Sequence, residues 1–240
     1  MLTFAAVLAD RLRREPGRPL VTFYDDETGE RVELSVTTYA NWVAKAGSLL
    51  VDELGLERGD TLRVDLPPHW LTPVFLGAAW SAGLVVTDAD DPAAVVCGPD
   101  RLDRWAREAA ERVVLACSLL PLGVRFAAPV PTGVHDVGID IWSQPDAFVP
   151  WDPPGDDDGA VDLAGVRLTQ QQMWEAGAPG ARGAPGGPPP GGPRAGSPPD
   201  LATFTEPLAK GGSVVLVTRA GAERLEAIDV AEHATARFPA

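Results

Sequence analysis

Lysine is scarce in this chain of 240 residues: there are two, Lys45 and Lys210, and the other members of the 20 basic residues are arginines. The acidic residues number 34, so the formal net charge is −14. Proteins that bind nucleic acid nonspecifically need Lys and Arg to displace counterions from the phosphates. We therefore expect no nucleic-acid partner, and chemistry that needs a lysine amine is restricted to Lys45 and Lys210.

Cysteine is equally rare, since Cys97 and Cys117 are the only ones, and each ends an apolar run. No Cys/His spacing typical of a metal site occurs, because His69, His135 and His233 lie far apart in the sequence. We expect no metal site and two buried, reduced thiols, which are typical of a cytoplasmic protein.

The sequence also has no uninterrupted apolar run of the kind that spans a membrane. The N-terminus is apolar first and basic afterwards, which is the reverse of a signal peptide. Residues 66–87 carry no formal charge and are long enough to span a bilayer. Pro67, Pro68, Pro73 and Gly83 interrupt them, which favours a buried helix followed by a buried strand. We therefore expect no membrane partner.

The first half of the chain alternates between short apolar runs and apolar residues at helical spacing. Residues 20–24 and 31–35 are rich in β-forming residues and flank a turn-forming segment, so they predict a hairpin. Helices are predicted over about 4–12, 38–54, 70–82 and 99–111, and further strands over 61–66, 84–87, 93–97 and 112–117. Such alternation predicts an α/β fold with a mostly parallel sheet and helices on both faces.

The pattern is less regular from residue 121 to 159. Beyond it, residues 166–168 predict a strand, and Thr169 with Gln172 forms a capping-box pattern that opens a short helix through Trp174. Near the C-terminus the regular pattern returns. Helices are predicted there over about 200–209 and 223–237, and a strand over 213–218.

Residues 177–199 interrupt this pattern, because 8 of the 23 are Gly and 8 are Pro, and none is Val, Leu, Ile or aromatic. Such a segment cannot supply a core, so it predicts a disordered Gly/Pro linker. The linker divides the chain into an amino-terminal α/β region, 1–176, and a helix–strand–helix segment, 200–240, that we expect to pack on the first region. A natural insertion and the product of two compensating frameshifts in a GC-rich gene both fit this composition.

Several phrases, taken in order, resemble the amino-terminal region of the adenylate-forming (AMP-binding) superfamily, which includes the acyl-CoA synthetases and the luciferases. Residues 34–43 are similar to its L-[ST]-Y-x-[EQ]-L segment, and 55–62 to G-[LV]-x-x-G-D-x-V. Residues 81–86 and 207–217 resemble two further strand entries. More narrowly, the chain is similar to short, truncated, actinobacterial-type homologues. The resemblance implies the fold of the family's amino-terminal subdomains, and ATP and Mg²⁺ as ligands.

The resemblance also implies where a nucleotide would bind. The family's Ser/Thr/Gly-rich phosphate loop ends in Pro-Lys, just before a G-V-x-x-[ST]-H phrase that residues 165–170 resemble, with Gln170 in place of the His. The preceding residues, 151–164, contain five Asp and no Ser, Thr, Lys or Arg. Carboxylates repel a triphosphate unless a metal ion intervenes, and the run of acids at 156–158 predicts a solvated loop. ATP and Mg²⁺ therefore rest on the resemblance alone.

No residue is assigned a catalytic or metal-binding role. The candidates for a residual binding site are Trp151, Thr169 and Gln170, which lie near the position of the phosphate loop. Trp142 and Trp174 lie near the same position, where they either line a pocket with Trp151 or simply pack.

Three other polar residues are interpreted as structural. Lys45 falls on an amphipathic helix and Lys210 in a helix-to-strand turn, where we expect a solvated cation. Neither matches the position of the family's catalytic lysine. His69 precedes a buried helix and is predicted to be a cap or turn residue.

Three functions follow as hypotheses. The first is a non-catalytic, degenerate relative of the acyl-CoA synthetases with a regulatory or interaction role, acting with a protein partner or as a homo-oligomer. The second is an active ATP-dependent acid ligase that uses altered residues or a complementing chain. The third is a protein that binds an acyl or aryl ligand without chemistry. We expect the first, and so expect no enzymatic activity.

Overall fold

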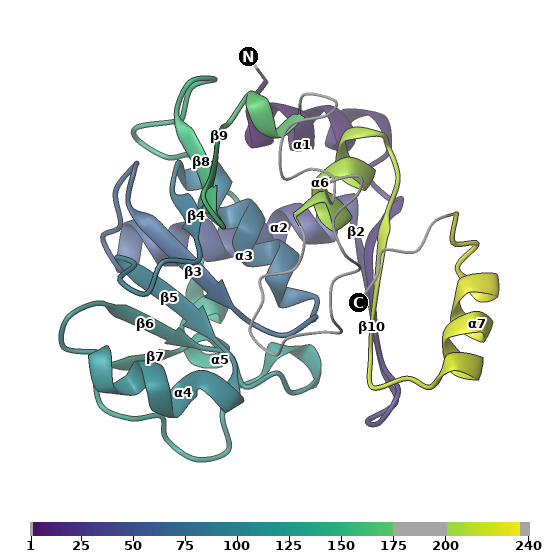
Figure 1. The fold of residues 1–240 in the computed structure, drawn as a ribbon. Coiled ribbons are helices and arrows are strands. Elements are labelled where there is room, and N and C mark those ends of the chain that lie inside the picture. The colour runs from purple at the N-terminus through teal and green to yellow at the C-terminus, as the bar shows by residue number, and fades with distance from the viewer. Residues whose placement is uncertain (1, 175–200, 236–240) are drawn as a thin grey trace.

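The computed structural model describes residues 2–174 and 201–235. The predicted linker, 177–199, and the last two residues of the helix predicted to end at 237 lie outside the described residues. Two sheets form the framework, one with the strand order β10-β1-β2 and one with the order β7-β6-β5-β3-β4-β8-β9 (Figure 1). The larger sheet is parallel except for β9, so the prediction of a mostly parallel α/β fold is confirmed.

The smaller sheet joins the two ends of the described chain. The predicted hairpin is present as β1 (Pro19–Asp25) paired antiparallel with β2 (Glu30–Ser35). β10 (Val214–Thr218) pairs parallel with the other edge of β1. The strand from the C-terminal segment thus completes a sheet that begins near the N-terminus.

The helices between the sheets begin at side-chain caps. α1 (Phe4–Arg14) starts at Thr3, whose hydroxyl oxygen accepts the backbone N–H of Ala6. α2 (Val36–Ser48) starts earlier than predicted, because Ser35 caps it and accepts the N–H of Thr38, the residue expected to open the helix. α3 (Leu71–Ala82) is buried along its whole length. These three helices lie between the two sheets (Figure 1). One apolar core contains residues of all three helices and of both sheets.

The larger sheet contains strands that the sequence pattern predicts and others that it does not. Its strands are β3 (Thr61–Asp65), β4 (Val85–Thr87), β5 (Ala94–Cys97), β6 (Val113–Ala116), β7 (Val134–Asp136), β8 (Gly159–Leu163) and β9 (Val166–Thr169). β7 falls where the pattern is irregular, because so short a strand shows no alternation, and β8 was not predicted. α4 (Pro99–Trp105) covers the opposite face from α3, so both faces carry helices as predicted.

Several elements differ in length from the prediction or were not predicted. α4 ends at Trp105 and continues as the 3-10 turn Ala106–Glu108, so the predicted helix over 99–111 is too long. α5 (Val137–Asp140) was not predicted. α6 (Ala202–Ala209) and α7 (Ala222–Ala231) agree in position with the last two predicted helices, although α7 ends earlier. No helix of the described residues is long and apolar enough to cross a membrane.

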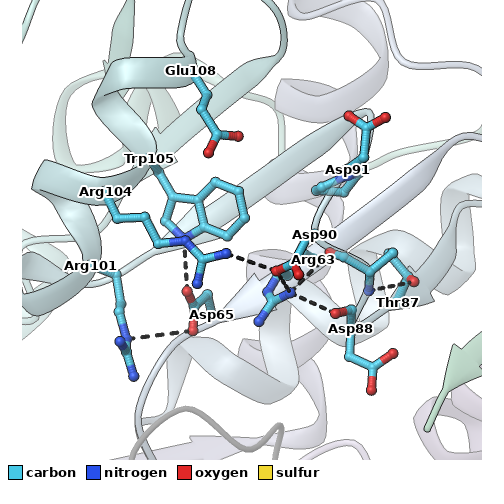
Figure 2. A network of polar contacts seen from close by, with 12 residues as sticks. Arg63, Asp65, Thr87, Asp88, Asp90, Asp91, Arg101, Arg104, Trp105 and Glu108 are labelled. Atoms are coloured by element: carbon cyan, nitrogen blue, oxygen red, sulfur yellow. Dashed lines mark hydrogen bonds and ion pairs between the residues drawn. The ribbon is translucent and has the colours of Figure 1, made fainter.

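Residues 88–93 connect β4 to β5 across β3, a parallel crossover that usually takes about a dozen residues or more. Arg63 of β3 donates to the carbonyl oxygen of Asp88 at 2.6 Å, as Figure 2 shows. It also donates to the carbonyl oxygen of Ala89, at 2.9 Å. At the end of β3, Asp65 accepts the indole N–H of Trp105 at 2.7 Å. This network holds the short crossover and α4 against the sheet, and it positions Asp88.

Candidate functional site

The position of the implied phosphate loop is a tight turn. β8 and β9 pair antiparallel with Leu163 opposite Val166, so Ala164 and Gly165 alone connect them. Both have positive φ, 50° and 79°, which is the geometry of a two-residue hairpin turn. The window 151–164 ends in β8, whereas the run of acids at 156–158, which was expected to form a solvated loop, lies in the irregular segment before that strand. A two-residue turn is too short to wrap a triphosphate with backbone N–H groups.

Acidic side chains surround this turn. The carboxylate of Asp88 accepts the backbone N–H of Ala164 at 2.9 Å. Asp162 of β8 pairs with Arg167 of β9 at 3.1 Å. An N–H group that a phosphate would need is thus already bound to a carboxylate, and the nearby arginine is paired.

Several of the acids before β8 have partners within the chain, at the protein surface. Arg58 bridges Asp152 (2.8 Å) and Asp158 (2.9 Å). The pKa of Asp158 is lowered, first by the backbone N–H of Gly155 and then by Arg58. Asp156 accepts the backbone N–H of Leu2 at 2.7 Å. Within residues 2–174 and 201–235, no group of three or more His, Cys, Asp or Glu side chains is arranged to hold a metal ion.

Gln170, which replaces the family's histidine, is fully buried. Its Oε1 accepts the N–H of Phe4 at the start of α1 (3.1 Å), and its Nε2 donates to the carbonyl oxygen of Trp80 in α3 (3.0 Å). Both ends of the amide are therefore used to tie β9 to two helices. Gln170 has a structural role here that the sequence pattern did not reveal.

The predicted capping box at the end of β9 is confirmed. The hydroxyl of Thr169 accepts the N–H of Gln172 at 3.3 Å, and the side chain of Gln172 accepts the N–H of Thr169 at 3.0 Å. The short helix that follows is the 3-10 turn Gln172–Trp174. Thr169 is thus engaged in its own helix cap.

The three tryptophans considered for a residual pocket have different surroundings. Trp142 packs on Trp42, with ring centroids 5.4 Å apart. Trp174 packs on Phe4 at 6.3 Å. Trp151 is 78% exposed. The described ring contacts do not join the three into one lining.

Both lysines have acidic or carbonyl partners. Lys45 binds the carbonyl oxygen of Gln144 and lies 3.0 Å from the carboxylate of Asp146. Lys210 pairs with Glu206 one turn earlier in α6, at 3.4 Å, so the expected solvated cation has a partner. Lys45 helps to hold the segment after α5 against α2.

His69 is the polar residue whose importance the sequence understated. Its Nδ1 accepts the N–H of Leu71 at 3.2 Å, which confirms the predicted turn role. Its ring is also buried and lies 4.7 Å from that of Phe23 in β1. Burial lowers its pKa to about 4, so the ring is neutral at pH 7. Because Phe23 is distant in sequence, no local pattern could reveal this contact.

Large apolar side chains are exposed mainly on one segment, residues 120–151. Leu122 is 70% exposed, Val149 88% and Trp151 78%. The other exposed members of this segment are Leu120, Val124, Ile139 and Trp142. Outside it, the described residues expose few large apolar side chains, Leu2 and Val230. We call residues 120–151, with their seven exposed apolar side chains, the exposed apolar segment.

Comparison with known sequences identifies one curated relative of uncharacterised function. The "TIGR03089 family protein" of Mycobacterium tuberculosis is 41% identical over 155 residues, which are 62% of this chain and 63% of that protein. No family model matches this chain. The chain thus spans about 63% of the curated relative that it resembles.

Solved structures show the fold more completely. The acyl-CoA synthetase of Brucella canis has a TM-score of 0.73 at 16% identity, covering 95% of this chain and 45% of its own. The N-terminal domain of FACL13 from Mycobacterium tuberculosis has a TM-score of 0.65 at 13% identity, covering 97% of this chain and 61% of its own. At such identities the likeness shows fold alone. The chain has the fold of the amino-terminal part of acyl-CoA synthetases, as the sequence resemblance implies.

Proposed function

We propose that this chain is a non-catalytic protein of the acyl-CoA synthetase-like fold, with a regulatory or interaction role in the cytoplasm. The observation that carries the proposal is the two-residue turn, Ala164-Gly165, at the position of the phosphate loop. Its Ala164 N–H is bound by Asp88. Phosphoryl chemistry needs donors and cations that neutralise the transferred charge, and this turn offers a carboxylate instead.

The test is carboxylate-dependent exchange of pyrophosphate into ATP, with a panel of aliphatic and aromatic acids and an active acyl-CoA synthetase as positive control. We expect no exchange above the protein-free rate. We also expect no rise in Tm with ATP or AMP, whereas a ligand present at 100 Kd would stabilise the fold by about 2.7 kcal/mol. Exchange with any acid would establish the alternative, an ATP-dependent acid ligase.

The exposed apolar segment supports the interaction role. Large apolar side chains that are exposed close together in the chain favour an interaction surface over isolated surface positions. We propose that this segment binds a protein partner, a second copy of the chain being the simplest case.

Light scattering tests that case. We expect an oligomer whose mass falls towards that of a monomer when Val149 and Trp151 are both changed to Ser. Val230→Ser is the matched control, because Val230 is 75% exposed but lies on α7. A wild-type monomer, or equal effects of the control, would contradict self-association through this surface.

The cytoplasmic location is supported by the thiols. Cys97 and Cys117 are both buried and unpaired, and burial raises the pKa of Cys97 to about 12. They face opposite sides of the sheet, because Cys97 packs with Trp105 on the α4 side and Cys117 belongs to the main core. We expect neither thiol to react with a disulfide reagent in the folded protein.

A further inference from the structure

Five residues lie together where the smaller sheet meets the end of β3. His69 and Trp70 follow β3 and are 3% and 2% exposed, with ring centroids 5.5 Å apart. The ring of His69 lies 4.7 Å from that of Phe23 in β1. Two residues further along β1, Asp25 stands opposite Glu30 of β2. We call Phe23, Asp25, Glu30, His69 and Trp70 the inter-sheet junction.

Residues 122–123 close one side of the junction. The backbone N–H of Leu122 lies close enough to the carboxyl group of Glu30 to oppose the rise in the pKa of that group. A Cβ atom on Gly123 would lie 3.4 Å from Cζ2 and Cη2 of Trp70, so this loop runs along the edge of the indole that also carries Nε1. The carboxyl group of Glu30 and the N–H edge of Trp70 therefore share the same neighbouring loop.

Three polar atoms of the junction are buried without a hydrogen-bond partner among the described residues: Nε2 of His69, Nε1 of Trp70 and Oε1 of Glu30. Because Nδ1 of His69 accepts the N–H of Leu71, the neutral ring carries its proton on Nε2. The junction thus buries two N–H donors and one carboxyl oxygen. Buried polar atoms are nearly always paired, so three at one place indicate a partner that the described chain does not supply.

Charge restricts the chemistry of that partner. Asp25 lies in the junction, paired with Arg219 from beyond β10. Burial raises the pKa of Glu30, and the charge of Asp25 adds to this effect. A second anion would therefore be repelled, whereas a neutral group with one acceptor and one donor would match all three free atoms.

We propose that the inter-sheet junction binds a small aromatic primary carboxamide. Its carbonyl oxygen accepts from the N–H groups of His69 and Trp70, and its amide N–H donates to Glu30. The rings of Phe23 and Trp70, with Trp42 centred 4.9 Å from Trp70, suit an aromatic body. This proposal goes beyond the proposed function and does not depend on it.

Benzamide is the probe, and benzoate is the matched charged control. Thermal unfolding and the indole N–H signals of ¹⁵N-labelled protein are followed during titration. We expect benzamide to raise Tm saturably and to shift the Trp70 indole signal, with benzoate at least about tenfold weaker because its charge meets Asp25 and Glu30.

Two substitutions locate the site. Trp70→Phe keeps an aromatic ring but removes a donor, so we expect about tenfold weaker binding of benzamide. Glu30→Gln removes a negative charge, so the ratio of the affinity for benzamide to that for benzoate should fall. Trp105→Phe is the control, because the N–H of Trp105 is already bound to Asp65 on the α4 side of the sheet. This variant should bind benzamide with the affinity of the wild type.

The proposal is overturned if benzamide changes neither Tm nor the Trp70 signal, which would mean that water alone pairs these atoms. It is equally overturned if Trp105→Phe weakens binding as much as Trp70→Phe, or if benzoate binds as well as benzamide. Folding of each variant is checked by circular dichroism before titration. Pyrophosphate exchange is measured separately, so a failure here leaves the test of the proposed function unaffected.

Discussion

The β8–β9 hairpin and the inter-sheet junction differ in how their polar groups are satisfied. At the hairpin, the N–H of Ala164 is bound by Asp88, and both ends of the Gln170 amide are bonded. At the junction, Nε2 of His69 and Nε1 of Trp70 are buried without partners among the described residues. A satisfied polar group has little to offer a ligand, whereas an unsatisfied buried one stabilises any matching partner. We therefore expect a ligand at the junction and not at the position that the family resemblance implies.

The largest expected effect is a fall in the stability of the fold at acid pH, caused by His69. Its pKa is about 4 in the folded protein and 6.5 in the unfolded chain. As the pH falls, the unfolded chain binds the proton first, so stability is full above pH 6.5 and is lost as the pH falls towards about 4. We expect a loss of about 3 kcal/mol across this window, measured by urea unfolding at each pH.

The control is a substitution at another histidine. His69→Asn can still accept the N–H of Leu71 but does not titrate, so the loss attributed to His69 should disappear. His135→Asn, at a side chain 39% exposed, should keep it. If the free energy of unfolding of His69→Asn depends on pH as that of the wild type does, the junction does not disfavour a protonated His69. The contrast between the hairpin and the junction would then be wrong.

A smaller effect is expected at the hairpin. Gln170→Leu keeps the volume of a fully buried side chain but removes its bonds to Phe4 and Trp80. We expect the free energy of unfolding to fall by about 2 kcal/mol, measured by denaturant titration. Gln171→Leu, at an exposed neighbouring position, is the control. If Gln170→Leu leaves the free energy of unfolding unchanged, the two hydrogen bonds of Gln170 do not stabilise the fold. The contrast between the hairpin and the junction is then weaker.

The capping box after β9 should contribute less. Thr169→Ala removes the acceptor for the N–H of Gln172 and should lower the free energy of unfolding by about 1 kcal/mol. Thr169→Ser retains the hydroxyl and should restore most of that loss. Equal effects of the two substitutions in thermal unfolding would indicate that packing of the methyl group, and not the cap, stabilises this turn.

The smallest effect is expected at Arg58. Its bonds to Asp152 and Asp158 are solvent-accessible, so Arg58→Ala should change Tm by little more than the precision of the measurement. High salt should remove any difference that remains, because it screens exposed pairs. A large fall in Tm would show that the bonds from Arg58 to Asp152 and Asp158 stabilise the fold as much as those of Gln170.

Local interactions were the part of this structure that could be predicted from sequence. The capping box at Thr169 and the end of α3 at Gly83 each depend on residues a few positions apart. Where two local candidates compete, sequence decides poorly: Ser35 caps α2, and Thr38 lies inside it. β7 is too short to show a period.

The candidate site depended on contacts that no local pattern contains. Gln170 meets Phe4 and Trp80 only because β9 packs against α1 and α3. Glu30 and Trp70 share the loop at Gly123 because two sheets meet there. The resemblance correctly implied the fold but not these pairings, since scaffold phrases specify turns and strands and say little of which buried groups find partners.

The sequence by itself determined the class of the fold, the main helices and strands, and the absence of Lys, Ser and Thr from the window before residue 165. Those properties depend on composition and short-range periodicity. Only the tertiary structure decided that this window ends in a two-residue turn and that polar atoms of His69, Trp70 and Glu30 are buried without partners among the described residues. Burial and pairing arise from residues far apart in the chain, and they set which polar groups remain available to a ligand.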